Sequence, residues 1–201
     1  MLSAILRGMA NIKSGAATVE GIAPGILMHR FSEQAEAEEE VRSIRQDRGT
    51  SRERAEQAAY RTDDGNLYAP STWFFRSIIE VGGYYKQRGS RKSLKYILPA
   101  AILVPADIIP LVDLDGKPIK DFEVDARPVV IPATKGRIMA YRPKIEVWRA
   151  TIPMEVDTTI IDLDMAHQLL EDAGRRQGVG DFRPEKKGPF GRFKIVRWDF
   201  K

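Results

Sequence analysis

Hydrophobic residues recur at helical spacing in two stretches of the chain. In residues 70–83 the large apolar side chains fall on one face of a helix, and two glycines end the stretch. Residues 162–173 repeat this arrangement, with Asp162 or Asp164 at the start and Gly174 just beyond the end. Both stretches are therefore predicted to form amphipathic helices that bury one face in a core.

Strand-like patterns occupy most of the other apolar stretches. Residues 17–31 form an apolar run that glycine and proline interrupt, which predicts a strand with a bend. Residues 126–132 are rich in β-branched side chains, and residues 137–156 alternate between apolar and polar positions in their second half. The closing stretch, residues 192–200, is predicted to form the last strand. Four half-buried strands are predicted.

The order of these elements is strand, helix, strand, strand, helix, strand. This is the order of a ferredoxin-like or RNA-recognition-motif-like βαββαβ core. We therefore expect an α+β fold in one domain over residues 1–201, with insertions after the first strand and after the first helix. A general α+β domain with a different strand order is the alternative.

Two stretches fall outside this core pattern. Residues 33–62 are charged, rich in glutamate and poor in large apolar side chains, so they are predicted to form a charged helical insertion at the surface. Residues 86–125 are basic at first and then apolar with several prolines. They are predicted to form the second insertion.

Composition excludes several classes of chemistry. The chain has no cysteine and two histidines, so it holds no disulfide, no thiol nucleophile and no cysteine-ligated metal. The longest apolar run, residues 97–106, is too short to cross a bilayer. We expect a cytoplasmic protein that requires no cofactor or metal and has no membrane partner.

Positive charge gathers in two places. The last 27 residues hold nine basic and three acidic side chains, although the whole chain carries a net charge of only +4. A second cluster contains five basic side chains with three tyrosines close by: Lys86, Arg88, Arg91, Lys92 and Lys95, beside Tyr84, Tyr85 and Tyr96. Basic side chains interleaved with aromatics are typical of nucleic-acid binding. Solvated surface charge with ordinary core tyrosines is the alternative.

The C-terminal cluster of charge includes a glycine-rich loop, residues 174–193, with the sequence GRRQGVGDFRPEKKGPFGRF. Glycine lets a backbone approach a phosphate closely, and basic side chains neutralise its charge. The loop follows a predicted helix and lacks the third glycine of a dinucleotide fingerprint, and the chain has no Gly-Lys-Ser/Thr motif. A phosphate-binding loop outside these two classes is predicted, and a flexible surface connection is the alternative.

The element order and the form Gly-Val-Gly…Gly-Pro-Phe-Gly-Arg-Phe of this loop resemble the RAMP superfamily of CRISPR-associated RNA-binding proteins. The resemblance implies an RNA-recognition-motif fold whose glycine-rich loop contacts RNA. It also implies a subunit that binds single-stranded RNA, or single-stranded DNA, without sequence specificity. Copies of such a subunit assemble side by side with other subunits of a ribonucleoprotein complex, for antiviral defence or in a phage or plasmid relative.

The resemblance and the charge pattern together give the candidate nucleic-acid-binding residues. They are Arg30, Lys86, Arg88, Arg91, Lys92, Lys95, Arg175, Arg176, Gly178, Gly180, Arg183, Lys186, Lys187 and Arg192. The aromatic motifs of ordinary RNA-recognition domains are missing, so a groove or a loop is expected to bind the strand in place of the open sheet.

We expect a protein that is not an enzyme. Some RAMP relatives cut RNA without metal through a histidine, which makes His29 the candidate for a metal-independent endoribonuclease; His167 is expected to be a surface residue. The paired aspartates have turn or capping explanations and predict no metal site. A third possibility is a protein-interaction module that mimics or caps such an assembly.

Overall fold

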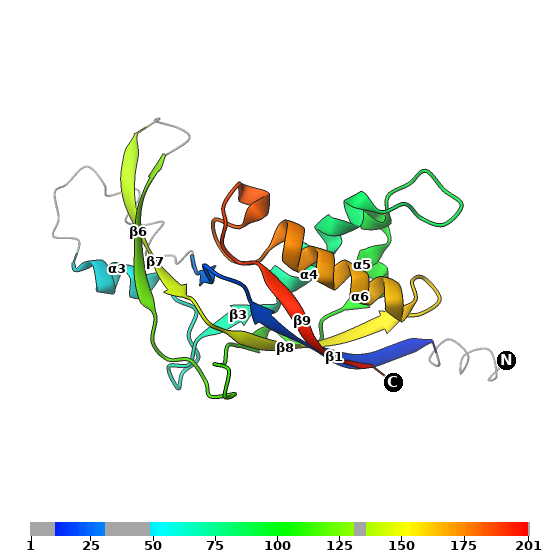
Figure 1. Cartoon of the computed structure of the whole chain (residues 1–201), viewed down its shortest axis with the longest axis horizontal. Helices are drawn as coiled ribbons and strands as arrows, with labels where there is room; N and C mark the ends of the chain where they lie inside the picture. Colours follow the sequence, from blue (N-terminus) through cyan, green and yellow to red (C-terminus); the bar gives the residue numbers. More distant parts are fainter. Residues whose placement is uncertain (1–10, 31–48, 131–135, 201) are drawn as a thin grey trace.

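A four-stranded antiparallel sheet with helices on one face organises the chain (Figure 1). The computed structural model describes residues 11–30, 49–130 and 136–200. In spatial order the strands are β4 (Ile102–Leu103), β8 (Arg149–Asp157), β1 (Ile12–Gly21) and β9 (Phe193–Phe200), and every neighbouring pair is antiparallel. The fold is α+β, as predicted.

Alternation along β8 fixes which face of this sheet is buried. Ala150, Ile152, Met154 and Val156 are all at most 1% exposed, whereas the residues between them point to the opposite face. Val19 of β1 lies on the same buried face. The alternation predicted for the second half of 137–156 is confirmed.

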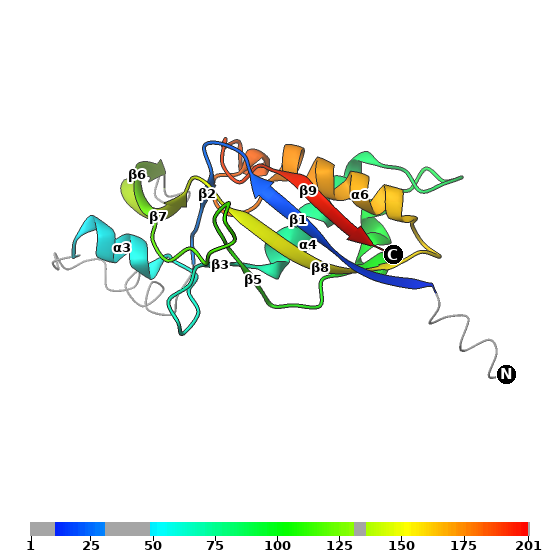
Figure 2. The ribbon, with the colours of Figure 1, turned by 60° about the horizontal axis from the view of Figure 1, so that its bottom comes forward.

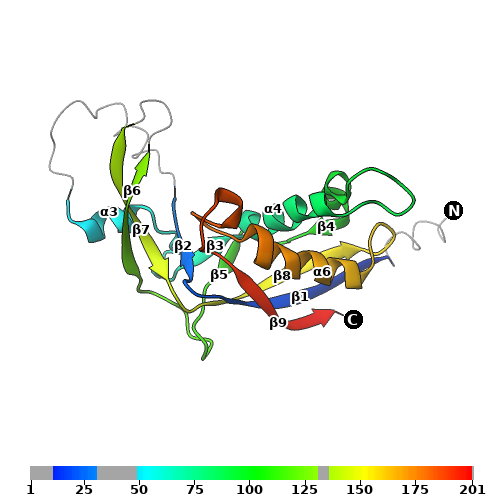
Figure 3. The ribbon, with the colours of Figure 1, turned by 45° about the horizontal axis from the view of Figure 1, so that its top comes forward.

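The two predicted helices cover the buried face of the sheet (Figure 3). Helix α4 (Ser71–Val81) buries Phe74, Ile78 and Val81, and α6 (Leu163–Asp172) buries Ala166, Leu169 and Leu170. The side chain of Asp162 accepts a hydrogen bond from the Met165 amide at 2.7 Å and so caps α6. Both helices are confirmed near their predicted bounds.

The predicted placement of the strands 126–132 and 137–156 side by side in the main sheet is wrong. β6 (Glu123–Val130) and β7 (Arg137–Ile145) form a hairpin that joins β2 (Ile26–Leu27) in a separate three-stranded sheet, which stands apart from the main sheet (Figure 1). Predicted residues 137–156 thus divide into two strands in two sheets. On the side of β8 away from β1, the neighbouring strand is the short β4, which lies inside the predicted 86–125 insertion.

The first predicted strand is also divided. Residues 17–31 contain the end of β1 and all of β2, and Gly25, with a φ of +95°, lies in the turn between them. The glycine and proline interruptions marked a change of direction large enough to move the chain from one sheet to the other.

The predicted charged insertion is described only in its last part. Residues 31–48 lie outside the described ranges, and Ser51–Gln57 form helix α3, which Thr50 and Glu53 cap reciprocally. The helix packs on the β6–β7 hairpin, where the Arg52 guanidinium lies 3.8 Å from the centre of the Phe122 ring and that of Arg54 lies 4.2 Å from the centre of the Tyr141 ring.

The remaining elements lie in the segment that precedes and follows β4. They are β3 (Tyr68–Pro70), the 3-10 turns η1 (Gly82–Tyr84) and η2 (Leu94–Tyr96), α5 (Leu98–Ala101) and β5 (Ile108–Pro110), which pairs with β3. None of the helices in the described ranges has both the length and the apolar character needed to cross a bilayer.

Candidate nucleic-acid interface

The glycine-rich loop, residues 174–193, is a packed part of the fold. It contains the π-helical turn η3 (Ala173–Gln177, whose first residue precedes it) and the 3-10 turn η4 (Pro184–Lys186). The side chains of Val179 and Phe190 are each 1% exposed, and the Arg127 guanidinium of β6 lies 4.8 Å from the centre of the Phe190 ring. The flexible connection considered from the sequence does not describe this loop.

Two glycines of the loop are required by close backbone contacts. Gly180 has a φ of +76°, and a Cβ atom there would lie 2.5 Å from the Leu27 carbonyl oxygen of β2. Gly191 has a φ of +74°, and a Cβ atom there would lie 1.8 Å from the carbonyl oxygen of Val179. Glycine therefore allows the loop to pack against itself and against β2.

Arg183 stabilises the loop from within. Its Nη1 donates a hydrogen bond to the Gly180 carbonyl oxygen at 2.8 Å, and its Nη2 forms an ion pair with Glu185. Burial raises the pKa of Glu185, but the hydrogen bond from Lys186 and the charge of Arg183 outweigh it and leave the pKa lowered. The guanidinium predicted to bind phosphate is thus already paired, so its direct contact with nucleic acid stays a prediction.

Several other predicted cations are exposed and carry no side-chain partner within the described residues. They are Arg88, Arg91 and Lys92 in the basic hairpin, residues 86–93, and Arg175, Lys187 and Arg192 in the glycine-rich loop. The basic hairpin is closed by a β-bridge between Lys86 and Ser93, and the backbone amide of Gln87 donates a hydrogen bond to the Lys92 carbonyl oxygen at 2.9 Å. Its exposed guanidinium and ammonium groups are therefore presented on an ordered backbone.

The fold brings the base of the basic hairpin to the end of α6, where the glycine-rich loop begins. Tyr85, at the base of the basic hairpin, donates a hydrogen bond from its hydroxyl to Oδ2 of Asp172 at the end of α6, at 2.6 Å. Arg176 lies over Tyr84, with its guanidinium carbon 5.2 Å from the ring centre, and pairs with Asp172 at 3.5 Å. Burial raises the pKa of Tyr85, and this hydrogen bond raises it further. Residues 87 positions apart in the sequence thus meet at one junction.

We call the exposed cations on the two sides of this junction the basic face. Its members are Arg88, Arg91 and Lys92 of the basic hairpin with Arg175, Arg176, Lys186 and Lys187 of the glycine-rich loop. Figure 1 shows both segments on the helix side of the sheet, with the basic hairpin beyond one end of the helices and the glycine-rich loop at the other. Lys95 is directed elsewhere, because its Nζ pairs with Glu80 of α4 at 2.5 Å.

Among the described residues, the strand register gives the open face of the main sheet (Figure 2) no aromatic side chain for a stacking platform. Thr18 and Thr151 lie on it and share a hydrogen bond of 3.1 Å between their hydroxyl oxygens. The aromatic residue Trp198 of β9 points the other way and packs edge-on against His167, with ring centres 5.0 Å apart. His167 is half-buried, and this ring contact gives it a packing role on α6.

His29 and Arg142 form a small charged cluster with Asp181 of the glycine-rich loop. The Nδ1 atom of His29 is 3.5 Å from Oδ2 of Asp181, and Nε of the buried Arg142 is 2.5 Å from the same oxygen. Burial raises the pKa of Asp181, but the hydrogen bond from His29 and the charge of Arg142 outweigh burial and lower it to about 2. Asp181 and Arg142 were not singled out from the sequence.

Replacing Asp181 by asparagine is expected to lower the free energy of unfolding at pH 7 by about 2 kcal/mol. Because the folded-state pKa is depressed, the carboxylate stabilises the wild type above pH 4, and this contribution is lost as the pH falls through about 2. Chemical denaturation at several pH values measures the difference. The matched variant is Asp199→Asn, whose exposed pair with Arg197 is expected to contribute less than about 1 kcal/mol. Equal effects of the two variants would contradict the assignment.

Arg30 follows His29 but belongs to another neighbourhood. Its amide donates to the Ala58 carbonyl oxygen at 3.0 Å. Burial raises the pKa of Tyr60, the neighbouring Tyr68 adds to the increase, and the charge of Arg30 opposes it. The structure thus places Arg30 beside Tyr60 and not at the junction of the basic face.

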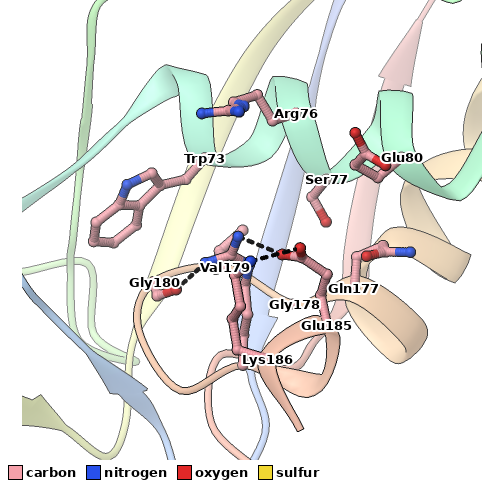
Figure 4. A pocket seen from close by; sticks show the side chains of 11 residues that line it. Trp73, Arg76, Ser77, Glu80, Gln177, Gly178, Val179, Gly180, Glu185 and Lys186 are labelled. Atoms are coloured by element: carbon pink, nitrogen blue, oxygen red, sulfur yellow. Dashed lines mark hydrogen bonds and ion pairs between the residues drawn. The ribbon is translucent and has the colours of Figure 1, made fainter. Parts of the chain in front are cut away.

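A pocket of about 340 Å³ lies between α4 and the glycine-rich loop (Figure 4). Its lining comes from both elements: Trp73, Arg76, Ser77, Glu80, Gln177, Gly178, Val179, Gly180, Arg183, Glu185 and Lys186. The residues on the loop side of the pocket were predicted from the sequence, and those on the helix side were not. The missed signal was the helical spacing of Trp73, Arg76 and Glu80 beside the apolar stripe of α4.

No group of three or more histidine, aspartate or glutamate side chains in the described ranges could hold a metal ion. No known protein family and no curated protein matches this chain.

Proposed function

We propose that this protein binds single-stranded nucleic acid, RNA in preference to DNA, through phosphate contacts and without sequence specificity. The observation that carries the proposal is the junction at Asp172, where Tyr85 and Arg176 join the basic hairpin to the glycine-rich loop. Cations distributed along one side of a molecule suit a polyanion that passes over several of them in succession. Because the open face of the main sheet has no aromatic platform, we expect the nucleic-acid strand to lie on the loops.

We propose further that the core is ferredoxin-like. The order β4-β8-β1-β9 supports this topology, since α4 lies between β1 and β4 in the sequence and α6 lies between β8 and β9. A glycine-rich loop between the second helix and the last strand supports membership of the RAMP superfamily. Such a subunit would assemble with copies of itself along one strand, within a cytoplasmic ribonucleoprotein complex of CRISPR or phage type.

The salt dependence of binding tests the phosphate contacts. Arg175→Ala combined with Arg192→Ala is expected to weaken binding equally for all base sequences and to flatten the salt slope by about 1.4 units, as for two lost contacts on a single strand. Arg183→Ala is expected to flatten it less, because that guanidinium is held by Gly180 and Glu185. Lys117→Ala with Lys120→Ala is the control. An unchanged slope in the first variant would remove the loop from the interface.

The second candidate function is a metal-independent endoribonuclease. It is favoured by the His29–Asp181 contact of 3.5 Å, because a carboxylate at one ring nitrogen orients a histidine that exchanges protons at the other. Gel analysis of the titrated strands distinguishes the two. Intact strands support the binding subunit, and cleavage that disappears in His29→Ala would support the nuclease.

A further inference from the structure

We propose that the pocket between α4 and the glycine-rich loop binds one nucleotide of the strand, with its base turned into the pocket and its phosphate at the rim. This inference rests on the proposed function and adds a site at which the base itself is contacted. The pocket volume of about 340 Å³ lies at the lower end of the range of about 300–1,000 Å³ that small-molecule sites have.

Trp73 supplies a surface on which a base can stack. The indole is partly exposed and lines the pocket, and Tyr60 packs edge-on against it with ring centres 5.3 Å apart and an interplanar angle of 86°. The tyrosine holds the indole in place on the side of α4. Stacking of a base on an aromatic side chain stabilises single-strand binding by about 1–3 kcal/mol.

Gln177 supplies an amide for the edge of a base. The residue is 8% exposed, and it lines the pocket beside Gly178 and Val179. Because it lines the pocket, its donor and acceptor are available to a base that enters.

Arg76 supplies a guanidinium for the phosphate. It is exposed on α4, three residues after Trp73, and it has no ion-pair partner among the described residues. The two carboxylates of the lining do not oppose an anion, since Glu80 pairs with Lys95 at 2.5 Å and Glu185 pairs with Lys186 at 3.1 Å. Aromatic ring, amide and free guanidinium together match the parts of a nucleotide.

Calorimetric titration with the four nucleoside 5′-monophosphates tests the pocket separately from the strand. The wild type is expected to bind at least one of them, and Trp73→Ala is expected to weaken that binding about 10-fold or more. Trp73→Phe should retain most of the affinity because an aromatic face remains. Arg76→Ala should weaken binding of the monophosphate while leaving the corresponding nucleoside unaffected. Thr72→Ala, at an exposed position on the same helix outside the pocket, is the control.

Anisotropy with labelled RNA is measured on the same proteins. Absence of monophosphate binding, or equal affinities of wild type and both Trp73 variants, would overturn the nucleotide pocket even if the strand still binds. If the wild-type protein does not bind the labelled RNA, the proposed function itself would be overturned. Quenching of indole fluorescence on titration supplies a spectroscopic check, because Trp148 is fully buried and Trp198 packs against His167.

Discussion

Gly191→Ala is expected to lower the free energy of unfolding by about 3 kcal/mol, the largest stability effect among the loop residues. The left-handed backbone conformation, with a φ of +74°, costs an alanine about 1–2 kcal/mol. The Cβ atom would also lie 1.8 Å from the Val179 carbonyl oxygen, and relieving such a clash in a packed region costs about 1–3 kcal/mol more. The loop would have to open, which would separate it from Gly25, whose carbonyl oxygen accepts the Gly191 amide at 2.7 Å.

Gly116→Ala is the matched control for this prediction. Gly116 has a similar φ of +82°, but nothing lies within 4 Å of where its Cβ atom would be. The only cost that remains is that of the left-handed backbone conformation, about 1–2 kcal/mol. Thermal melting should therefore place the Gly191 variant several degrees below the Gly116 variant, since 1 kcal/mol shifts the midpoint by about 2–4 °C in a chain of this size. Equal midpoints would show that the loop is not packed as described.

Replacing Arg88, Arg91 and Lys92 by glutamine is expected to weaken binding of single-stranded RNA about 100-fold at 0.1 M salt. Each phosphate contact on a single strand changes the logarithm of affinity by about 0.7 for each tenfold change in salt. Three contacts therefore contribute about 2 logarithmic units, or about 100-fold in affinity, between 1 M and 0.1 M salt. All three side chains are exposed at the basic hairpin, whose backbone hydrogen bonds do not involve them. Fluorescence anisotropy measures the affinities.

A triple variant with the same change in charge controls for the loss of net positive charge. Lys117, Lys120 and Arg197 replaced by glutamine remove three cations from elsewhere on the molecule: two from the segment between β5 and β6, and one from β9 (Figure 1). This variant is expected to lose less than about 5-fold, because charges beyond a Debye length of about 10 Å are largely screened. Similar losses in both variants would place the strand elsewhere or show that net charge alone attracts it.

Elements with a strong local signal could be predicted from the sequence. Helices α4 and α6 each present one apolar stripe, and β8 alternates over most of its length, so local spacing determines their form. The glycine-rich loop and the basic hairpin could also be found, because residue type alone marks them.

Strand pairing could not be predicted, because it depends on contacts distant in the sequence. β4 pairs with β8 through only Ile102 and Leu103, a stretch too short to show any period. The β6–β7 hairpin is rich in β-branched residues, yet several of its side chains are exposed, and residue type does not indicate which sheet a strand joins.

The functional site was predicted only in part, for the same reason. The cations of Arg175 and Lys187 are exposed as a basic loop suggests, but nothing local indicates that Arg183 is paired with Glu185 or that Arg142 and His29 meet at Asp181. These pairings arise when distant segments pack together. The hydrogen bond from Tyr85, at the base of the basic hairpin, to Asp172 is likewise a property of the fold.

Titration of labelled single-stranded RNA and DNA of several lengths, followed by fluorescence anisotropy over a series of salt concentrations, tests the central claim most directly. We predict affinity that rises with strand length, a steep fall in affinity with salt, a preference for RNA and strands that remain intact. Absence of binding to either strand at low salt would contradict nucleic-acid binding altogether and would direct attention to an acidic protein partner for the basic face.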